Sequence, residues 1–406
     1  MNRNSILAIV VSISILCLLG AASTESPKLP GARAGIHAAD FPSIQAALDA
    51  VPEEGGVVIL PPGTFEISEP LVIHQSDVSF HGSGSSTHIK NVNESGQPAI
   101  VIAHQGHTRN GNDRQHELWR VRLANFRISG NANSGDGIVA YNVNEIFVDG
   151  ISVSYHGGDG LKLSFCYEDP RIVSSLITYN KKVGVNLIGC HDIVVSSNQF
   201  EENQDGLHCI DGYNLCMTGN CLDDHLGDGV VIENTYGSVV SGNMIEECQA
   251  AAVVMDRDCY GNTVSANVIA HNGAGVDLRD AHGCAISANT FTIMQSDAVR
   301  IGPNSGRIAV SANAFSDSYI GEGSLKRTED DRNAAGMVLS GAKDVLVSSN
   351  AFTGVRPTAI SKASSDGARA AFTGNLFVDT ATDVESETMS GSKSSAAGNF
   401  SIRPIE

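Results

Sequence analysis

The chain has 406 residues and a net charge of −19, with 42 glycines, a single tryptophan and only 5% aromatic residues. This length ordinarily indicates two or three domains, unless the chain is repetitive, because a repeat protein grows by adding units. The acidic balance and the lack of any Lys/Arg run exclude a nucleic acid as partner. An anionic polymer would need a local basic cluster or bound cations to hold it against this charge.

The N-terminus is typical of an export signal. Arg3 is positively charged, residues 6–19 are apolar, and small residues follow them. We expect a signal peptide over residues 1–22 and a linker over residues 23–37. An uncleaved membrane anchor is the alternative, which the shortness of the apolar run disfavours. Export predicts a secreted or periplasmic protein with no membrane contact after cleavage.

A short capping helix is predicted directly after the linker. Asp40 is a suitable N-cap and Pro42 fits the first helical turn. The apolar residues between 44 and 51 share one helical face. Such a helix would cover the N-terminal end of a repetitive structure, whose core is otherwise exposed there.

A repeat of about 23 residues runs through most of the chain. Short apolar phrases end in asparagine, with spacings of 22 to 25 residues and one of 37. A sustained period of this length predicts a solenoid. We expect the side-chain amides to stack as an asparagine ladder, in which each amide bonds the next and satisfies turn backbone. The ladder asparagines are Asn198, Asn220, Asn243, Asn267, Asn289, Asn313, Asn350 and Asn375.

Each repeat also contains a short strand that follows an Asp-Gly pair or its equivalent. The second and fourth residues after that aspartate are apolar or small, from Ile138 and Ala140 to Met337 and Leu339. Alternation directs these residues inward and the residues between them outward. A constant register predicts parallel strands stacked about 4.8 Å apart. The Asp-Gly pair itself is typical of a turn, and we expect its glycine to adopt a positive φ.

The stretch DFPSIQAALDAVPEEGGVVILPPGTFEIS, followed by these Asn-marked coils, resembles the pectate-lyase-like superfamily, which has the pectin lyase fold. The resemblance implies an all-β, single-stranded right-handed parallel β-helix over residues 38–400, with a tail over residues 401–406. This superfamily includes lyases, hydrolases, epimerases, fructan-cleaving transferases and non-catalytic coils. The resemblance is therefore specific for the fold and not for one activity.

In proteins of this type the substrate groove runs along the strand that follows the Asp-Gly turn, so the outward residues of these strands are the candidates. Arginine suits a uronate carboxylate, which it binds bidentately, and histidine or lysine suits a general acid or base. The expected catalytic residues are Lys162, His208, Arg279 and Arg300, and the expected substrate contacts are Tyr141, Asn186 and Arg300.

Three outward carboxylates, Glu233, Asp256 and Asp277, are the expected ligands of a Ca²⁺ ion, because hard cations prefer clustered carboxylate oxygens. The alternative is structural. Asp256 and Arg279 lie one coil apart, as do Asp277 and Arg300, and such surface pairs contribute about 0–1 kcal/mol each.

Eight cysteines remain after cleavage of the signal, and an even number permits disulfides in an exported chain. Cys209 falls on an inward position, where a free cysteine serves as a small apolar residue. Cys166 and Cys190 occupy equivalent places in successive repeats, so they are the one pair in which a disulfide is considered.

Two insertions interrupt the repeat. Residues 318–334 would overhang the charged strands beside Arg300, and long loops on repeat scaffolds often have a function. Residues 103–119 contain His104, His107 and His116. A solvated loop is favoured there over a metal site.

The leading hypothesis is an exported lyase that acts on a uronate-containing polysaccharide. In that chemistry a cation or an arginine neutralises the carboxylate and a basic side chain removes the α-proton. No motif of the epimerases, polygalacturonases or pectate lyases is complete, and Asp223-Asp224 lacks companion motifs. A non-catalytic β-helix scaffold or binding protein, as in copper-delivery systems, is the alternative. A glycoside hydrolase or a fructan-cleaving transferase is a minor one.

Overall fold

A computed structural model describes residues 29–316, 335–362, 369–382 and 395–402. The expected signal peptide and the insertion at residues 318–334 lie outside these ranges. The chain divides into residues 1–33 and 34–406, and the second unit is the repetitive one. Within the described ranges, no helix is long and apolar enough to cross a membrane.

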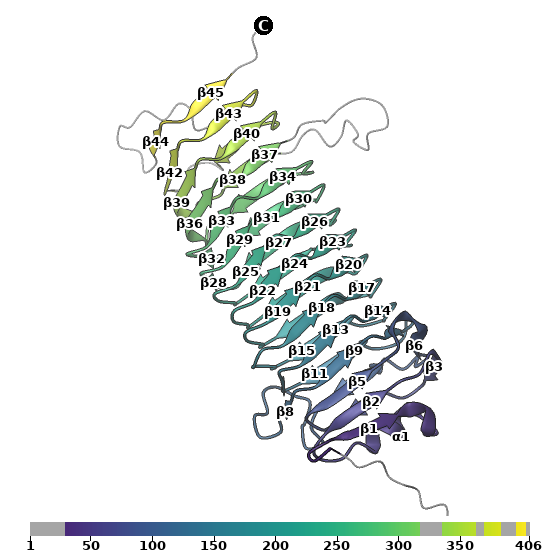
Figure 1. Ribbon diagram of the computed structural model, residues 1–406. Helices are drawn as coiled ribbons and strands as arrows, with labels where there is room; N and C mark the ends of the chain where they lie inside the picture. The colour runs from purple at the N-terminus through teal and green to yellow at the C-terminus, as the bar shows by residue number, and fades with distance from the viewer. Residues whose placement is uncertain (1–28, 317–334, 363–368, 383–394, 403–406) are drawn as a thin grey trace, which may run out of the picture. The chain divides into compact units, whose positions relative to one another are not determined.

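The unit from residue 34 onward is a coil in which most turns contribute one strand to each of three parallel sheets (Figure 1). Successive coils pair in register, as between Leu161 and Val185 and between Leu187 and Cys209. Parallel strands joined by crossovers of one hand form a right-handed coil. The predicted all-β parallel β-helix is therefore confirmed.

The 12-stranded sheet follows the Asp-Gly turns. Its strands are β4 (Leu71–Ile73), β7 (Ile100–Ile102), β11 (Ile138–Tyr141), β15 (Leu161–Ser164), β18 (Val183–Ile188), β21 (Asp205–Ile210), β24 (Val230–Glu233), β27 (Ala251–Asp256), β31 (Ala274–Leu278), β35 (Asp297–Ile301), β38 (Ala335–Leu339) and β41 (Ile360–Lys362).

The 17-stranded sheet comes next in each coil. Its strands are β1 (Ala34–His37), β2 (Gly56–Ile59), β5 (Val78–His81), β9 (Arg122–Ala124), β13 (Phe147–Asp149), β16 (Arg171–Val173), β19 (Val194–Ser196), β22 (Cys216–Thr218), β25 (Val239–Ser241), β28 (Cys259–Tyr260), β29 (Thr263–Ser265), β32 (Ala281–His282), β33 (Ala285–Ser287), β36 (Gly306–Ser311), β39 (Lys343–Ser348), β42 (Arg369–Thr373) and β44 (Ser395–Ala397).

The 14-stranded sheet completes each coil, and a two-stranded sheet stands apart. The 14 strands are β3 (Gly63–Ile67), β6 (Thr87–Asn91), β10 (Arg127–Ser129), β14 (Ser152–Ser154), β17 (Leu176–Thr178), β20 (Gln199–Glu201), β23 (Cys221–Asp223), β26 (Met244–Glu246), β30 (Val268–Ala270), β34 (Thr290–Thr292), β37 (Ala314–Ser316), β40 (Ala351–Thr353), β43 (Leu376–Val378) and β45 (Phe400–Ile402), and the pair is β8 (Leu118–Trp119) with β12 (Val143–Asn144).

The N-terminal helix α1 (Ile44–Asp49) follows the 3₁₀ turn η1 (Ala38–Asp40), and a second 3₁₀ turn is η2 (Gly84–Ser86). The N-cap of α1 is Ser43 rather than Asp40, because the Ser43 hydroxyl accepts a hydrogen bond from the backbone of the first helical turn. The buried face of α1 contains three of the expected residues, Ile44, Ala47 and Leu48.

The β-structure extends beyond the boundaries expected from the sequence. Strand β1 lies inside the expected linker, 23–37, where it pairs with β2 along its whole length and buries Ile36. At the other end, β45 reaches Ile402, inside the expected tail. Ile36 is an isolated apolar residue between Gly35 and His37, too short a pattern to identify a strand from sequence.

The recurring asparagines form one continuous column of hydrogen bonds. Asn243, for example, donates its Nδ2 to Oδ1 of Asn267 at 3.0 Å and to the carbonyl of Met217 at 3.1 Å. Its backbone N–H donates to the same Oδ1 at 2.9 Å. The pattern repeats from Asn198 to Asn375, and these side chains are at most 3% exposed. Each amide therefore satisfies buried groups of the neighbouring coil.

The glycine of the Asp-Gly pair has a different role from the expected one. The glycines of these pairs, such as Gly206 and Gly229, do not adopt a positive φ. Instead, a Cβ at Gly206 would lie 2.4 Å from the carbonyl oxygen of Gly229, and a Cβ at Gly229 would lie 2.6 Å from that of Ala252. The glycine is required because neighbouring coils approach closely at this corner.

All eight cysteines of the unit after residue 34 are free thiols. Cys166 and Cys190 are therefore not bridged, and Sγ of Cys190 donates instead to the carbonyls of Leu163 and Ile188. Cys209 is fully buried, as its inward position predicts. The cysteines serve mainly as small core residues.

Two histidines replace asparagine in a second inward column. His156 and His225 occupy the places that Asn180 and Asn203 hold in the coils between them, and both are fully buried. Neither ring nitrogen of His156 has a hydrogen-bond partner, nor does Nε2 of His225. Burial lowers the pKa of both imidazoles to about 4.

Replacing Asn267 with alanine is expected to lower the free energy of unfolding by about 2–3 kcal/mol, because it leaves the backbone N–H and the side-chain amide of Asn243 without their acceptor. Denaturant unfolding measures this change. Thr290→Ala, at an exposed position of the next coil, is the control and should change stability by less than about 0.5 kcal/mol. An equally small effect of Asn267→Ala would contradict a stabilising ladder.

The buried histidines predict a loss of stability in mild acid. An unfolded histidine takes up a proton near its ordinary pKa of about 6.5, whereas folded His156 stays neutral until about pH 4. Its contribution is therefore fully present above pH 6.5 and is lost as the pH falls towards 4. The variant His156→Asn, which copies Asn180, should lose this part of the pH dependence, about 3 kcal/mol between pH 6.5 and 4. Denaturant unfolding at several pH values tests this, and parallel curves for both proteins would refute it.

Candidate functional site

The outer face of the 12-stranded sheet carries the residues that the sequence singled out. From Lys162 to Arg300 the face spans six coil steps, about 29 Å. The strand register places one outward residue per coil in a single column: Val139, Lys162, Asn186, His208, Val231, Val254, Asp277, Arg300 and Val338. A second column begins with Tyr141 and Ser164 and includes Glu233 and Asp256. The predicted columns are therefore confirmed, and what differs is how their side chains pair.

The middle of this face is apolar. Val231 and Val254 point outward, yet they are only 8% and 1% exposed, and they pack with Ala251 in a cluster separate from the main core. Polar side chains lie on both sides of this cluster along the column. The face therefore has two polar regions with an apolar centre.

The first polar region, which we call the Tyr141 group, consists of Asp136, Tyr141, Asp159, Lys162 and Asn186. Asp136 accepts a hydrogen bond from the backbone of Asp159 at 2.7 Å, and Asn186 donates to Oδ2 of Asp159 at 2.8 Å. Oδ1 of Asn186 is buried without a partner. Among the described residues, the ammonium of Lys162 makes no hydrogen bond or ion pair, so this partly exposed group is available to a ligand.

Two lysines lie near the carboxylate of Asp136. Burial raises the pKa of Asp136, whereas Lys162 and Lys182 act in the opposite direction. Burial also raises the pKa of Tyr141, helped by Asp136 and opposed by Arg109. The phenol of Tyr141 is therefore protonated at neutral pH and is able to donate a proton.

The insertion at residues 103–119 forms a wall of the Tyr141 group. The ring of His107 lies 5.6 Å from that of Tyr141, and its Nε2 bonds Oδ1 of Asn142 at 2.9 Å. His107 is only 6% exposed, so the expectation of a solvated loop is wrong for this residue. His104 and His116 stack on each other at 5.1 Å. The contact between this loop and Tyr141 could not be predicted from the sequence, because the insertion does not follow the repeat.

Ion pairs between residues of the same coil occupy the rest of this face. His208 pairs with Asp205 at 3.1 Å beside Asn186, before the apolar centre. In the second polar region, beyond that centre, Arg279 pairs with Asp277 at 2.9 Å and Arg300 with Asp297 at 2.9 Å. The expected pairs between coils, Asp256 with Arg279 and Asp277 with Arg300, do not form among the described residues. Partners on the same strand lie two or three residues away along an extended backbone, where a long arginine reaches them without spanning a coil.

The expected Ca²⁺ ligands do not converge. Glu233 binds Arg257 at 2.7 Å, Asp277 binds Arg279, and Asp256 accepts a hydrogen bond from the backbone of Arg257. In the described part of the chain, Glu233, Asp256 and Asp277 are not among the groups whose ligand atoms all lie within 4.8 Å of one another. Two other clusters meet that condition.

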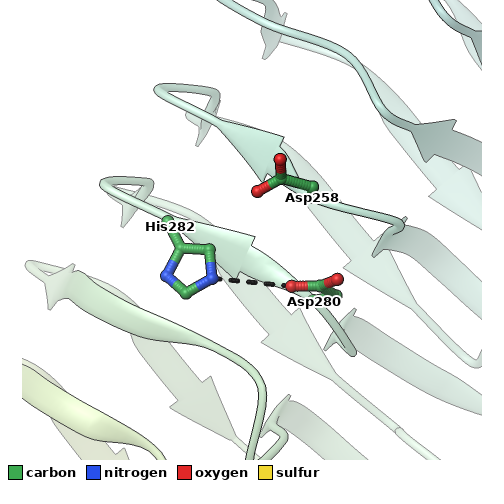
Figure 2. Close-up of side chains that lie close together, drawn as sticks. All are labelled: Asp258, Asp280 and His282. Carbon is green, nitrogen blue, oxygen red and sulfur yellow. Dashed lines mark ion pairs between the residues drawn. The ribbon is translucent and has the colours of Figure 1, made fainter.

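The first of these clusters is Asp258, Asp280 and His282, which come from neighbouring coils (Figure 2). Nε2 of His282 lies 3.5 Å from Oδ1 of Asp280, and each residue offers a ligand atom within 4.8 Å of the other two. One imidazole nitrogen with carboxylate oxygens suits Cu²⁺ or Zn²⁺ better than Ca²⁺. The sequence signal for this cluster is the spacing of one repeat between Asp258 and Asp280.

The second cluster is Asp223, Asp224 and Glu247. Burial and the adjacent carboxylates, chiefly Glu247, raise the pKa of Asp224 to about 6. His225, the next residue, points into the core and cannot join the cluster. Carboxylates alone do not identify a ligand, so no role is assigned to it.

Several solved structures share the fold of this chain. The A-module of mannuronan C-5 epimerase AlgE6 from Azotobacter vinelandii aligns over 91% of this chain and 100% of its own, with 16% identity and a TM-score of 0.56. Tailspike protein 3 of bacteriophage CBA120 aligns over 84% of this chain, which spans only 61% of the tailspike, with 11% identity and a TM-score of 0.59. The periplasmic alginate epimerase AlgG aligns over 91% of this chain and 84% of its own, with 10% identity and a TM-score of 0.53. At these identities the likenesses show the fold alone, which is the parallel β-helix described above.

No curated protein sequence matches this chain. A family model described as periplasmic copper-binding protein (NosD) matches residues 123–319 and again residues 168–393. The second match alone covers more than half of the chain, and the two overlap because the repeats are alike. The chain therefore belongs to the NosD family.

Proposed function

We propose that the protein is exported, binds a uronate-containing polysaccharide along the outer face of the 12-stranded sheet, and cleaves it by β-elimination at the Tyr141 group. The main support is the set of three cations, Lys162, Lys182 and Arg109, that act on Asp136 and Tyr141 in a chain of net charge −19. A local basic cluster of this kind is what an anionic polymer needs on an acidic protein.

The comparisons agree with this substrate class. Two of the structures with the same fold are named as epimerases of mannuronan and alginate. The description of the NosD family as periplasmic supports export.

Each step of the elimination has a candidate residue. A base removes the C5 proton, the C4–O bond breaks as the C4–C5 double bond forms, and an acid protonates the departing oxygen. We assign neutralisation of the uronate carboxylate to Lys162 and protonation of the leaving oxygen to Tyr141. Asp136 is assigned as the base, because its raised pKa makes it a better proton acceptor than an ordinary carboxylate.

The ion pairs on both sides of the apolar centre would extend the binding face. His208, Arg279 and Arg300 are paired with carboxylates in the free protein, and these partly exposed pairs stabilise it by only about 0–1 kcal/mol each. Exchange of the aspartate partners for uronate carboxylates therefore costs little. These residues are proposed as further binding positions and not as the centre of the reaction.

The first test follows unsaturated-uronate absorbance with pectate, alginate and glycosaminoglycans, in the presence of Ca²⁺. Tyr141→Phe is expected to lower kcat by about 10²–10⁴-fold with little change in KM, because it removes only the proton donor. Lys162→Ala should raise KM as well. Lys343→Ala, in the 17-stranded sheet, is the matched control and should not change activity. New reducing ends without absorbance would indicate a hydrolase, and no activity from the folded protein would refute the proposal.

A second candidate function is binding of a divalent cation at Asp258, Asp280 and His282. The family description names copper, and the imidazole with two carboxylates fits Cu²⁺, which nitrogen and oxygen sites bind more tightly than other divalent first-row metals. The eight cysteines do not provide this site, since six of them are buried. The chemistry supplied would be capture of the ion at the surface, with these three side chains as its ligands.

His282→Ala is expected to weaken Cu²⁺ binding at least tenfold, because it removes the only nitrogen ligand of the cluster. Isothermal titration calorimetry of the full protein measures the affinity. His88→Ala is the control, since His88 bonds Ser129 and has no carboxylate cluster beside it. Equal affinities of the wild-type protein and His282→Ala would exclude the site.

A further inference from the structure

A column of aromatic residues follows the segment that leads from the 12-stranded sheet into the 17-stranded one, and its last two members lie in the short strands β28 and β32, which Figure 1 labels. It contributes one ring per coil, and we call it the aromatic strip. Backbone bridges align its members in register between adjacent coils. Its members are Tyr167, His191, Tyr213, Tyr236, Tyr260 and His282.

The strip is a surface feature. Tyr213, Tyr236 and Tyr260 are 47%, 51% and 43% exposed, although the centroids of adjacent rings are only 5.9–6.3 Å apart. The chain has eight tyrosines, and four of them occupy this one turn position. A turn without any further role would not be expected to contain half of the tyrosines of the chain.

Two of the rings pack against the turn glycine of the next coil. A Cβ at Gly261 would lie 3.8 Å from Cε2 of Tyr236, and a Cβ at Gly283 would lie 3.5 Å from Cζ of Tyr260. The rings of Tyr236 and Tyr260 are also stacked, with an angle of 12° between their planes. The exposed half of each tyrosine is therefore the part that neither the glycine nor the neighbouring ring covers.

Hydrogen-bonding side chains flank the strip on both sides. Asn234 donates to Asp211 at 2.8 Å on the side of the 12-stranded sheet, where Arg257 also approaches Asp211 at 3.6 Å. On the other side Asn214 donates to Asp192 at 2.8 Å. Amides and carboxylates on both sides of a row of rings offer donors and acceptors to a polar ligand.

Charged side chains mark the two ends. The guanidinium of Arg114, from the 103–119 insertion, lies 4.7 Å from the centroid of Tyr167. That of Arg307 lies 5.4 Å from the centroid of Tyr260. Beyond Tyr260 the strip ends at His282, beside Asp280 (Figure 2).

We infer that the aromatic strip binds a neutral polysaccharide whose chain lies parallel to the coil axis. The apolar faces of sugar rings stack on aromatic rings, and sugar hydroxyls bond amides and carboxylates of the kind that flank the strip. The coils repeat every 4.8 Å or so, comparable to the length of one sugar residue, so successive sugars meet successive rings. Three aspartates beside the strip, Asp192, Asp211 and Asp280, are matched by three arginines, Arg114, Arg257 and Arg307, so these six groups add no net charge, which suits uncharged sugars.

This inference goes beyond the proposed elimination and does not depend on it. The strip lies on a turn, whereas Lys162 points outward from the 12-stranded sheet. A heteropolysaccharide could occupy both, with its uronates at the Tyr141 group and its neutral sugars on the strip. A neutral polymer could occupy the strip alone.

The test is calorimetric titration of the full protein with hexasaccharides of β-1,4-linked glucose, xylose and mannose. At least one should bind to the wild-type protein, and the double variant Tyr213→Ala/Tyr236→Ala should bind it at least tenfold more weakly. Tyr236→Phe, which keeps the ring, should bind within about threefold of wild type. The control is Tyr155→Ala/Tyr179→Ala, which removes another stacked pair, with centroids 5.0 Å apart, of which Tyr155 is exposed and Tyr179 partly buried, and should leave binding unchanged.

A second measurement avoids any effect of the variants on folding. In protein labelled with 3-fluorotyrosine, the ¹⁹F resonances of Tyr213, Tyr236 and Tyr260 should shift on addition of the bound hexasaccharide, and those of Tyr155 and Tyr179 should not. No binding of any neutral hexasaccharide, or equal shifts at both sets of tyrosines, would overturn the inference. Lys162→Ala should retain this binding whether or not the protein proves to be a lyase, which separates the failure of one proposal from that of the other.

Discussion

The structure depends on the close approach of neighbouring coils at their corners. At the Asp-Gly corner, the position of Gly206 leaves no room for a side chain, and at the next inward corner each asparagine must satisfy the backbone of its neighbour. A coil that deviates at either corner would lose buried hydrogen bonds or collide with the next coil. Every coil therefore keeps nearly the same length and register, and variation is confined to outward side chains and to the turns between sheets.

That confinement determines what kind of ligand the protein suits. Outward residues at the same place in successive coils form columns with one side chain about every 4.8 Å. A polymer with a short repeat meets the same column again and again, whereas a small molecule meets only one or two coils. Both the polar face of the 12-stranded sheet and the aromatic strip are such columns. Because the overall charge is −19, the proposed anionic ligand depends on the local cations, Lys162 and Lys182 near Asp136 and Arg109 near Tyr141.

The periodic features of the structure could be predicted from the sequence, and the non-periodic ones could not. The outward column of Lys162, His208 and Arg300 follows from alternation and constant spacing, and the structure confirms it. The ion-pair partner of Arg300 could not be predicted from the spacing. The register determines which residues are neighbours, but it does not determine which neighbour a long side chain reaches. The docking of His107 on Tyr141 depends on an insertion without a repeat. The aromatic strip is also periodic in the sequence. It lies outside the strands of the 12-stranded sheet, so a prediction based on the alternation in those strands does not include it.

The most direct test of the account is a crystal structure of the slowed variant Tyr141→Phe with a bound uronate hexasaccharide. The account predicts a ligand that lies along the outer face of β11, β15 and β18, with a carboxylate at the ammonium of Lys162 and its leaving oxygen at the position of the Tyr141 side chain. A ligand bound to the 14-stranded or the 17-stranded sheet, or a face that stays empty at saturating concentrations, would contradict it.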